Sequence, residues 1–415
     1  MNKKQWIVFA LAAGALVVPQ TALAAGFANT SHSATAVGMG TVGTANLDEP
    51  NVNFFNPAGM AFQDSWNIYV GGTMLAPSVD YESPDGSITE QTESQIFLPP
   101  NISVAVPVTE DISVGLGATF PWGLGIEWPD DWVGAEEFRS QSLETANLMA
   151  NVAYDVPGID LGVSAGVQVL RSAVEQRRLA VLPDGNEVDV QLGGTGTGIG
   201  LSAGAMYRAT DDVTLGLSYR SAATIDYEGR AHFSDGAEGT PFQQRFVDQD
   251  ITTQITVPHV VNAGVGYQLL EELWLGFDVN YMSWRTYDEL VIEYAEQSPE
   301  GAPGSTDPPT VVRADWEDAV AFRLGGQYQI TDQIKGRLGV GLDMTPVPDE
   351  TVGPSLPDND RYIASVGLGY ETGGFRADAA YQMIALPTRT IDNDTVDGDY
   401  QLFSHTASLN VGYGF

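Results

Sequence analysis

The chain has 415 residues, with 54 acidic and 18 basic side chains, and its formal net charge is -36. A surface of this sign disfavours nucleic acid and anionic lipid headgroups as partners. The chain contains no cysteine. If it is exported, it must therefore be stabilised without disulfide bonds.

The first 24 residues have the features of a secretory signal peptide. Lys3 and Lys4 precede an apolar run from Ile7 to Val18, and Ala22-Leu23-Ala24 forms a small-x-small cleavage site. We therefore predict that residues 1–24 are removed and that Ala25 starts the mature chain, which then carries 16 basic residues and a charge of -38, because only Lys3 and Lys4 are lost. No later stretch approaches the roughly 20 apolar residues of a transmembrane helix.

Residues 25–64 are rich in glycine and show little alternation. They contain Phe54, Phe55 and the turn-forming run Asn56-Pro57-Ala58-Gly59, in which proline fixes φ and glycine relieves the exit. A free tail is one interpretation, but the aromatic residues are too apolar for a disordered segment. We expect this segment to fold inside the protein that follows it.

From Trp66 onward, fourteen segments alternate apolar with small or polar residues, as strands with two different faces do. In the last of them Leu409, Val411 and Tyr413 alternate with Asn410 and Gly412. The connections alternate between short and long, which is typical of outer-membrane barrels. Closure also leaves no unpaired edge in the hydrocarbon. The predicted fold is all-β, a fourteen-stranded antiparallel transmembrane β-barrel over residues 65–415, with residues 25–64 as a hatch in the lumen. Outer-membrane lipid and the barrel-assembly machinery are the expected partners.

Strand parity predicts which side chains point into the lumen. Arg323, Arg337 and Arg361 are expected to face inward and could bind a carboxylate by charge-assisted hydrogen bonds. Alternatively, they pair with luminal acids and fix the hatch. The apolar side chains on inward parity could line a pocket or contact Phe54 and Phe55; they are Leu170, Val174, Met282, Trp284 and Ile384.

Two features lie near residue 121. The third strand, Ile112 to Phe120, runs into Pro121-Trp122-Gly123, where proline removes a ladder donor, so the strand either breaks or ends there. The long loop at 121–140 carries Trp128, Trp132 and Phe138 among acidic residues. We expect an exposed apolar patch that captures ligand; an aromatic collar at the rim is the alternative.

Several short motifs, in order, resemble the FadL/TodX transporters of long-chain fatty acids and hydrocarbons. They are Ala25-Gly26-Phe27, Val37-Gly38-Met39-Gly40, Asn56-Pro57-Ala58-Gly59-Met60, Pro99-Pro100-Asn101-Ile102, Trp122-Gly123-Leu124, Leu143 to Leu148, Tyr281 to Trp284, Pro346-Val347-Pro348 and Leu356 to Tyr362. The resemblance implies a hatch that carries the Asn-Pro-Ala motif, an outer capture groove, an interior pocket, and a kink in the third strand that opens a lateral route. Lys335 is the sole lysine of the predicted mature chain, so carboxylate binding through lysine is in doubt.

The sequence thus predicts a passive outer-membrane channel for long-chain fatty acids or related hydrophobic molecules. Neutral hydrocarbons are the alternative ligand, and an open porin is the alternative class. The four histidines are scattered and no zinc spacing occurs, so we expect no enzyme activity, no catalytic residue, no metal and no cofactor. A rim hydrolase is the remaining possibility, because triads are recognised by geometry.

Overall fold

The computed structural model describes residues 26–295, 310–393 and 395–415. The predicted signal peptide and Ala25 lie outside these ranges. None of the described helices has the length and apolar character needed to cross a membrane.

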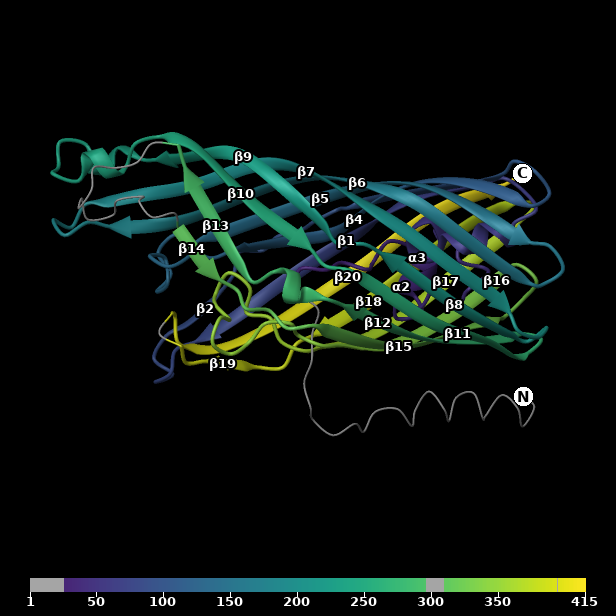
Figure 1. The fold of residues 1–415 in the computed structure, drawn as a ribbon. Helices are drawn as coiled ribbons and strands as arrows, with labels where there is room; N and C mark the ends of the chain where they lie inside the picture. Colours follow the sequence, from purple (N-terminus) through teal and green to yellow (C-terminus); the bar gives the residue numbers. More distant parts are fainter. Residues whose placement is uncertain (1–25, 296–309, 394) are drawn as a thin grey trace.

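The described strands form one closed antiparallel sheet, shown as a long tilted barrel in Figure 1. Its first half contains β1 (Asn67–Glu82), β3 (Pro100–Pro107), β4 (Ile112–Glu127), β5 (Ser140–Val156), β6 (Leu161–Val181) and β7 (Glu187–Arg208). The barrel closes where β1 pairs along its whole length with the last strand, β20 (Gly398–Gly414).

Four consecutive wall strands are interrupted at one level. The first three of the four are β8 (Val213–Arg220) with β9 (Ala223–Phe233), β10 (Gln249–Val257) with β11 (Val260–Leu270), and β12 (Leu273–Met282) with β13 (Glu289–Tyr294). The wall is completed by β14 (Thr310–Arg313) with β15 (Ala319–Gln329), β16 (Ile334–Asp343), β17 (Arg361–Thr372) and β18 (Phe375–Ala385). Counting each interrupted strand once, the described residues make fourteen wall strands, which confirms the predicted fold class.

The remaining elements are short. Strands β2 (Thr89–Gln91) and β19 (Arg389–Ile391) extend the sheet beside β1 and β20 at the end with the long loops. The 3₁₀ helices η2 (Asp235–Ala237), η3 (Gln243–Arg245) and η4 (Trp284–Thr286) lie in connections. The long loop predicted at 121–140 is shorter than expected, because β4 continues to Glu127.

The two faces of the strands differ as a membrane barrel requires. In β20, Thr406, Ser408 and Asn410 are buried, whereas Leu409 between them is 66% exposed. The same outward apolar series continues around the wall through Leu116, Leu148, Ile199, Leu217, Leu338 and Leu368. This exposed apolar band faces the hydrocarbon, and the polar face surrounds the lumen.

The N-terminal segment, residues 26–66, crosses the interior of the barrel. Its elements are α2 (Ala34–Val37), α3 (Val52–Phe55) and η1 (Pro57–Phe62). Helix α2 packs on β17, β18 and β20, whereas α3 and η1 pack on the strands from β3 to β7 on the other side of β1. In Figure 1 both α2 and α3 are surrounded by strands in the half of the barrel that carries the short turns.

Inward side chains hold this segment through its backbone. Asp278 of β12 accepts hydrogen bonds from the amides of Gly43 and Thr44, both at 2.9 Å. At Gly339 of β16 the two backbones approach so closely that a Cβ atom would lie 2.0 Å from the carbonyl carbon of Met39. Glycine on the inner face therefore allows the N-terminal segment to lie directly against the wall.

Candidate ligand cavity

Strand β4 parts from its neighbour β3 halfway along its length. The two strands pair from Pro107↔Ser113 to Ile102↔Ala118 and no further. On its other edge β4 continues beside β5, but the register shifts between Thr119 and Trp122, around Pro121. The shift is a β-bulge, which bends a strand and increases its twist. The strand therefore does not end at Phe120; it bends there and continues.

The N-terminal segment occupies the edge that β4 exposes after the bulge. The amide of Asn29 donates to the carbonyl of Pro121 at 2.8 Å, and the amide of Gly123 donates to the carbonyl of Phe27 at 3.0 Å. Ala28 and Trp122 form an isolated antiparallel bridge. The backbone groups of β4 that would continue the wall thus bond to a segment inside the barrel.

Residues 92–99 cover the wall between β1 and the bent part of β4. Leu75 of β1 and Phe97 exchange two backbone hydrogen bonds of 2.9 Å, and the backbone amide of Glu93 donates to the carbonyl of Glu127 at 2.7 Å. Within the described chain, no backbone hydrogen bond joins residues 94–98 to residues 119–126. The wall is therefore discontinuous here, and the aromatic ring of Phe97 lies against the Cα atom of Gly125, where a Cβ would be 1.9 Å from the ring.

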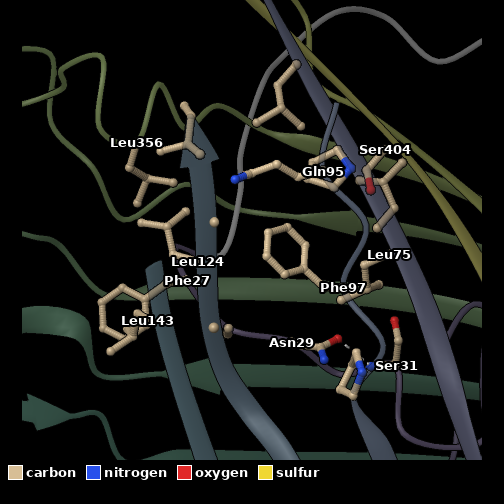
Figure 2. Close-up of a pocket in the computed structure, with 18 of the residues that line it drawn as sticks. Phe27, Asn29, Ser31, Leu75, Gln95, Phe97, Leu124, Leu143, Leu356 and Ser404 are labelled. Carbon is tan, nitrogen blue, oxygen red and sulfur yellow. Dashed lines mark hydrogen bonds between the residues drawn. The ribbon is translucent and has the colours of Figure 1, made fainter. Parts of the chain in front are cut away.

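A cavity of about 450 Å³ lies behind this discontinuity. Figure 2 shows the ring of Phe97 beside β4, with Phe27, Leu124 and Leu143 on one side and Leu75 on the other. The apolar side chains that line the cavity are Phe27, Ala28, Leu75, Pro77, Val79, Ile96, Phe97, Leu98, Pro99, Pro100, Phe120, Trp122, Leu124, Ile126, Leu143, Leu356, Pro357, Ile363, Ile384, Leu386 and Leu402. A concave, mostly apolar space with a few polar groups is the usual form of a small-molecule site.

Several polar side chains of the lining are already bonded within the protein. Asn29 donates to the carbonyl of Phe120 at 3.3 Å, and its side-chain oxygen accepts from the amide of Ser31 at 3.0 Å. Gln95 donates to the carboxylate of Glu127 at 3.1 Å. These bonds tie the N-terminal segment and residues 92–99 to β4 and fix the shape of the cavity.

Arg361, at the start of β17, anchors the beginning of the N-terminal segment. Its guanidinium donates to the carbonyls of Gly26 and Ala28 and to the carboxylate of Asp358, whose other oxygen accepts from the amide of Gly26 at 3.0 Å. The neighbouring Asp360 lies in the loop before β17. Burial, together with the charge of Asp358, raises the pKa of Asp360 to about 7.

The structure brings part of the predicted site together. Of the predicted residues, those that line the cavity are Phe120, Trp122, Gly123, Arg361 and Ile384. Arg323 and Arg337 lie outside it and bond to the buried acids Asp343, at 2.9 Å, and Asp378, at 2.6 Å. Arg323 also donates to the carbonyl of Gly40 at 3.3 Å. Their geometry matches the alternative in which inward arginines pair with luminal acids and hold the N-terminal segment.

The aromatic residues after β4 do not form an exposed patch, and that prediction is wrong. Trp128, Trp132 and Phe138 are each only 2% exposed. The rings of Trp128 and Trp132 stack at 4.4 Å, and Tyr81 and Tyr400 pack edge-on or tilted beside them. The chain folds back at this end of the barrel, so these rings are buried in the same apolar cluster as Phe27 and Trp122.

The predicted apolar inward residues belong to the core that adjoins the cavity. Leu170, Val174, Met282 and Trp284 pack into one apolar cluster with Trp122 and Phe27, and none of the four is among the lining residues. Phe27 inserts between Trp284, at 4.6 Å between ring centroids, and Trp316, at 5.5 Å. Phe54 and Phe55 pack elsewhere, against Ala36 and Met149.

The run Asn56-Pro57-Ala58-Gly59 joins α3 to η1 away from the cavity. Asn56 caps η1 by accepting from the amide of Ala58 at 3.2 Å, and it donates to the carbonyls of Thr44, at 2.9 Å, and Ala205, at 3.0 Å. A Cβ atom at Gly59 would lie at van der Waals contact distance from the side chain of Met206 of β7. Nearby, Arg220 donates to the carbonyl of Phe54 at 2.7 Å and lies over its ring. Side chains of the wall thus fasten the turn on several sides.

Residue-by-residue reasoning missed most of the cavity lining, notably Phe27, Leu75, Gln95, Phe97, Leu124, Leu143, Leu356 and Ser404. A signal did exist. The motifs at 25–27, 99–102, 143–148 and 356–362, which carried the family resemblance, all supply lining residues. Segments far apart in sequence that match one family can be expected to meet at its site. Among the described residues, no three His, Asp or Glu side chains group as a metal site.

Comparisons with known proteins agree with the fold. The model of the family described as outer membrane protein transport protein (OMPP1/FadL/TodX) matches residues 15–415. The long-chain fatty acid transport protein of Escherichia coli K12 is 24% identical over 446 residues, with 98% of this chain and 97% of that protein covered. The 47 kDa outer membrane protein of Pasteurella multocida is 25% identical over 431 residues, with coverages of 98% and 97%.

Solved structures show the same architecture. A Pseudomonas aeruginosa FadL homologue superposes with a TM-score of 0.84 at 20% identity, covering 94% of this chain and 100% of that one. The Pseudomonas putida toluene transporter TodX superposes with a TM-score of 0.70 at 14% identity, covering 94% and 99%. At these identities the superpositions establish the fold. With the family match over the barrel, they confirm the resemblance drawn from sequence motifs and the location in the outer membrane: the chain belongs to the OMPP1/FadL/TodX family of outer membrane transport proteins.

Proposed function

We propose that the protein is a passive channel for hydrophobic small molecules and that the cavity behind β4 is its binding site. The observation that carries the proposal is the position of this apolar cavity, between the N-terminal segment and the place where β4 leaves β3. The names of the relatives suggest two ligand classes. One relative is a long-chain fatty acid transport protein and a structural neighbour is a toluene transporter.

The N-terminal segment acts in this proposal as a hatch. It contacts separate parts of the inner wall, and hydrogen bonds that involve Asp278, Arg323 and Asn56 fasten it on the side of the short turns. A ligand in the cavity touches the first residues of this segment, Phe27 and Ala28, and lies beside the discontinuity covered by Phe97. These contacts support release either through the wall or after a shift of the hatch.

An open porin is the competing class, and conductance separates the two. A lumen crossed by a packed segment should pass little ionic current in a planar bilayer, because the segment excludes water from the pore. Deletion of residues 25–64 should produce large, steady conductance. Large conductance of the intact protein would overturn the hatch.

A cavity-filling substitution tests the binding site. Ser404→Trp places a large ring in the cavity from β20, whereas the matched control Leu409→Trp changes an outward side chain of the same strand that is 66% exposed. We expect Ser404→Trp to lower uptake of a radiolabelled hydrophobic compound by cells at equal amounts of folded barrel, and Leu409→Trp to leave uptake unchanged. Equal uptake by both variants would refute the assignment of the cavity.

A further inference from the structure

The cavity offers no uncommitted cation to a ligand. Its charged lining residues among those described are Arg361, Glu93, Glu144 and Asp343, one positive against three negative side chains. Arg361 uses both terminal nitrogens within the protein, for the carbonyls of Gly26 and Ala28 and the carboxylate of Asp358. A ligand carboxylate could approach this guanidinium only by displacing the start of the N-terminal segment.

The other inward arginines near the cavity are buried and paired. Arg323 is 1% exposed and bonds through all three nitrogens, to Asn280, Gly40 and Asp343. Arg337 is 2% exposed and bonds to Gln327 and Asp378. Removing either arginine from its acid would leave an uncompensated buried charge, which is strongly unfavourable. Neither side chain is available to bind a ligand.

Two of the three acids of the cavity differ from these arginines because they are not neutralised, whereas the third, Asp343, pairs with Arg323. Glu93 and Glu144 are exposed side chains, and in the described chain no salt bridge joins either of them to a cation. At the long-loop end, a second and more open depression of about 410 Å³ is lined by Asp80, Glu82, Glu90 and Asp399 without any cation. The potential along this side of the barrel is therefore negative from the rim to the cavity.

An ionised headgroup and a neutral chain experience this lining differently. A neutral chain is stabilised by each CH₂ group that it buries against the apolar lining. A carboxylate gains the same from its chain, but its headgroup must lose water without gaining a cation, and it meets carboxylates of the same sign. Two ligands with the same chain therefore differ in binding free energy only through the headgroup.

Accordingly, we propose that the cavity selects uncharged hydrophobic molecules and discriminates against ionised carboxylates. The inference rests on the proposed function and narrows its ligand class to hydrocarbons and their uncharged derivatives. Glu93 and Glu144 are then specificity-determining residues, because they oppose an anionic headgroup without forming part of the apolar surface that holds the chain.

A matched ligand pair tests the proposal. Radiolabelled hexadecanoate and methyl hexadecanoate have the same chain and differ in charge, and their binding is measured at pH 8 to the full mature protein in neutral-lipid nanodiscs. Ser404→Trp in the same nanodiscs serves as the blank that reports partition into lipid. We expect the ester to bind at least about tenfold more tightly than the carboxylate, a difference of about 1.4 kcal/mol.

The double variant Glu93→Gln/Glu144→Gln supplies the second arm. It should raise the ratio of carboxylate affinity to ester affinity several-fold, because glutamine keeps size and polarity but removes charge. Carboxylate binding as tight as that of the ester in the unaltered protein would overturn the selectivity while the channel proposal stands. A ratio unaffected by the double variant would overturn the assignment to these two residues. Binding of neither ligand above the blank would overturn the proposed cavity itself.

Discussion

Replacement of Asn56 by alanine should loosen the N-terminal segment without unfolding the barrel. The Asn56 side chain makes three hydrogen bonds: it donates to the carbonyls of Thr44 and Ala205 and accepts from the amide of Ala58. A hydrogen bond contributes about 0.5–1.5 kcal/mol net, so their loss should lower the local stability by roughly 1.5–4.5 kcal/mol. The strands keep their ladders, because none of these bonds belongs to the sheet.

Hydrogen–deuterium exchange measures this local stability directly. Peptides covering residues 43–60 should exchange about 10- to 1,000-fold faster in Asn56→Ala, while strand peptides keep their protection. Asn186→Ala is the control, since Asn186 lies exposed in the loop between β6 and β7 and bonds to Asp184. Bilayer recordings should show more frequent opening for Asn56→Ala alone. Unchanged exchange in residues 43–60 would refute the reasoning and leave Asn56-Pro57-Ala58 as a simple turn.

Further predictions concern charge and packing. Asp343→Leu leaves Arg323 without its buried partner and should destabilise the protein by about 3–5 kcal/mol. The temperature at which the barrel unfolds, measured as a shift of its band on gels, should therefore fall. Asp250→Leu, in the exposed pair with Arg230, should change this temperature little. Trp132→Ala should destabilise by about 3–5 kcal/mol because the ring stacks on Trp128 in a buried cluster; normal stability with weakened ligand capture would instead favour an exposed capture patch. The pKa of Asp360 is raised from its ordinary 3.8 to about 7, so between these pH values the folded state binds more protons than the unfolded state. The stability of the anchored N-terminal end should therefore fall as pH rises through this range, and it should level off above it. Exchange at residues 26–31 should report this change, and Asp360→Asn should abolish it; the same pH dependence in that variant would assign it to another group.

Much of the barrel could be predicted from local sequence patterns. An alternation such as that of Leu409, Val411 and Tyr413 with Asn410 and Gly412 depends only on the two faces of one strand. The short and long connections then indicate a closed membrane barrel, because an open edge in hydrocarbon is too costly. Inward parity of Arg323, Arg337 and Arg361 follows from the same period, and the structure places all three on the inner side.

What each inward arginine binds could not be predicted in this way. Arg323 pairs with Asp343 on the neighbouring strand β16, and Arg337 pairs with Asp378 on β18, two strands away. Such pairs depend on the register of the strands, which is a property of the sheet. The exposure of Trp128 and Trp132 was wrongly predicted for a related reason. The sequence around an aromatic loop does not show which residues cover it, and here Tyr81 of β1 and Tyr400 of β20 pack against Trp128.

The sequence by itself determined the strand periodicity, the alternating connections, the inward polar face and the family motifs, because each is written in residues close together along the chain. The cavity was decided by tertiary structure alone. It exists because β4 bends at Pro121 and takes Phe27 and Asn29 as backbone partners from inside the barrel, while Phe97 covers the wall outside. The cavity is built from the N-terminal segment and from two parts of the wall. Only closure of the barrel brings the unpaired backbone amides and carbonyls of these segments within hydrogen-bonding distance.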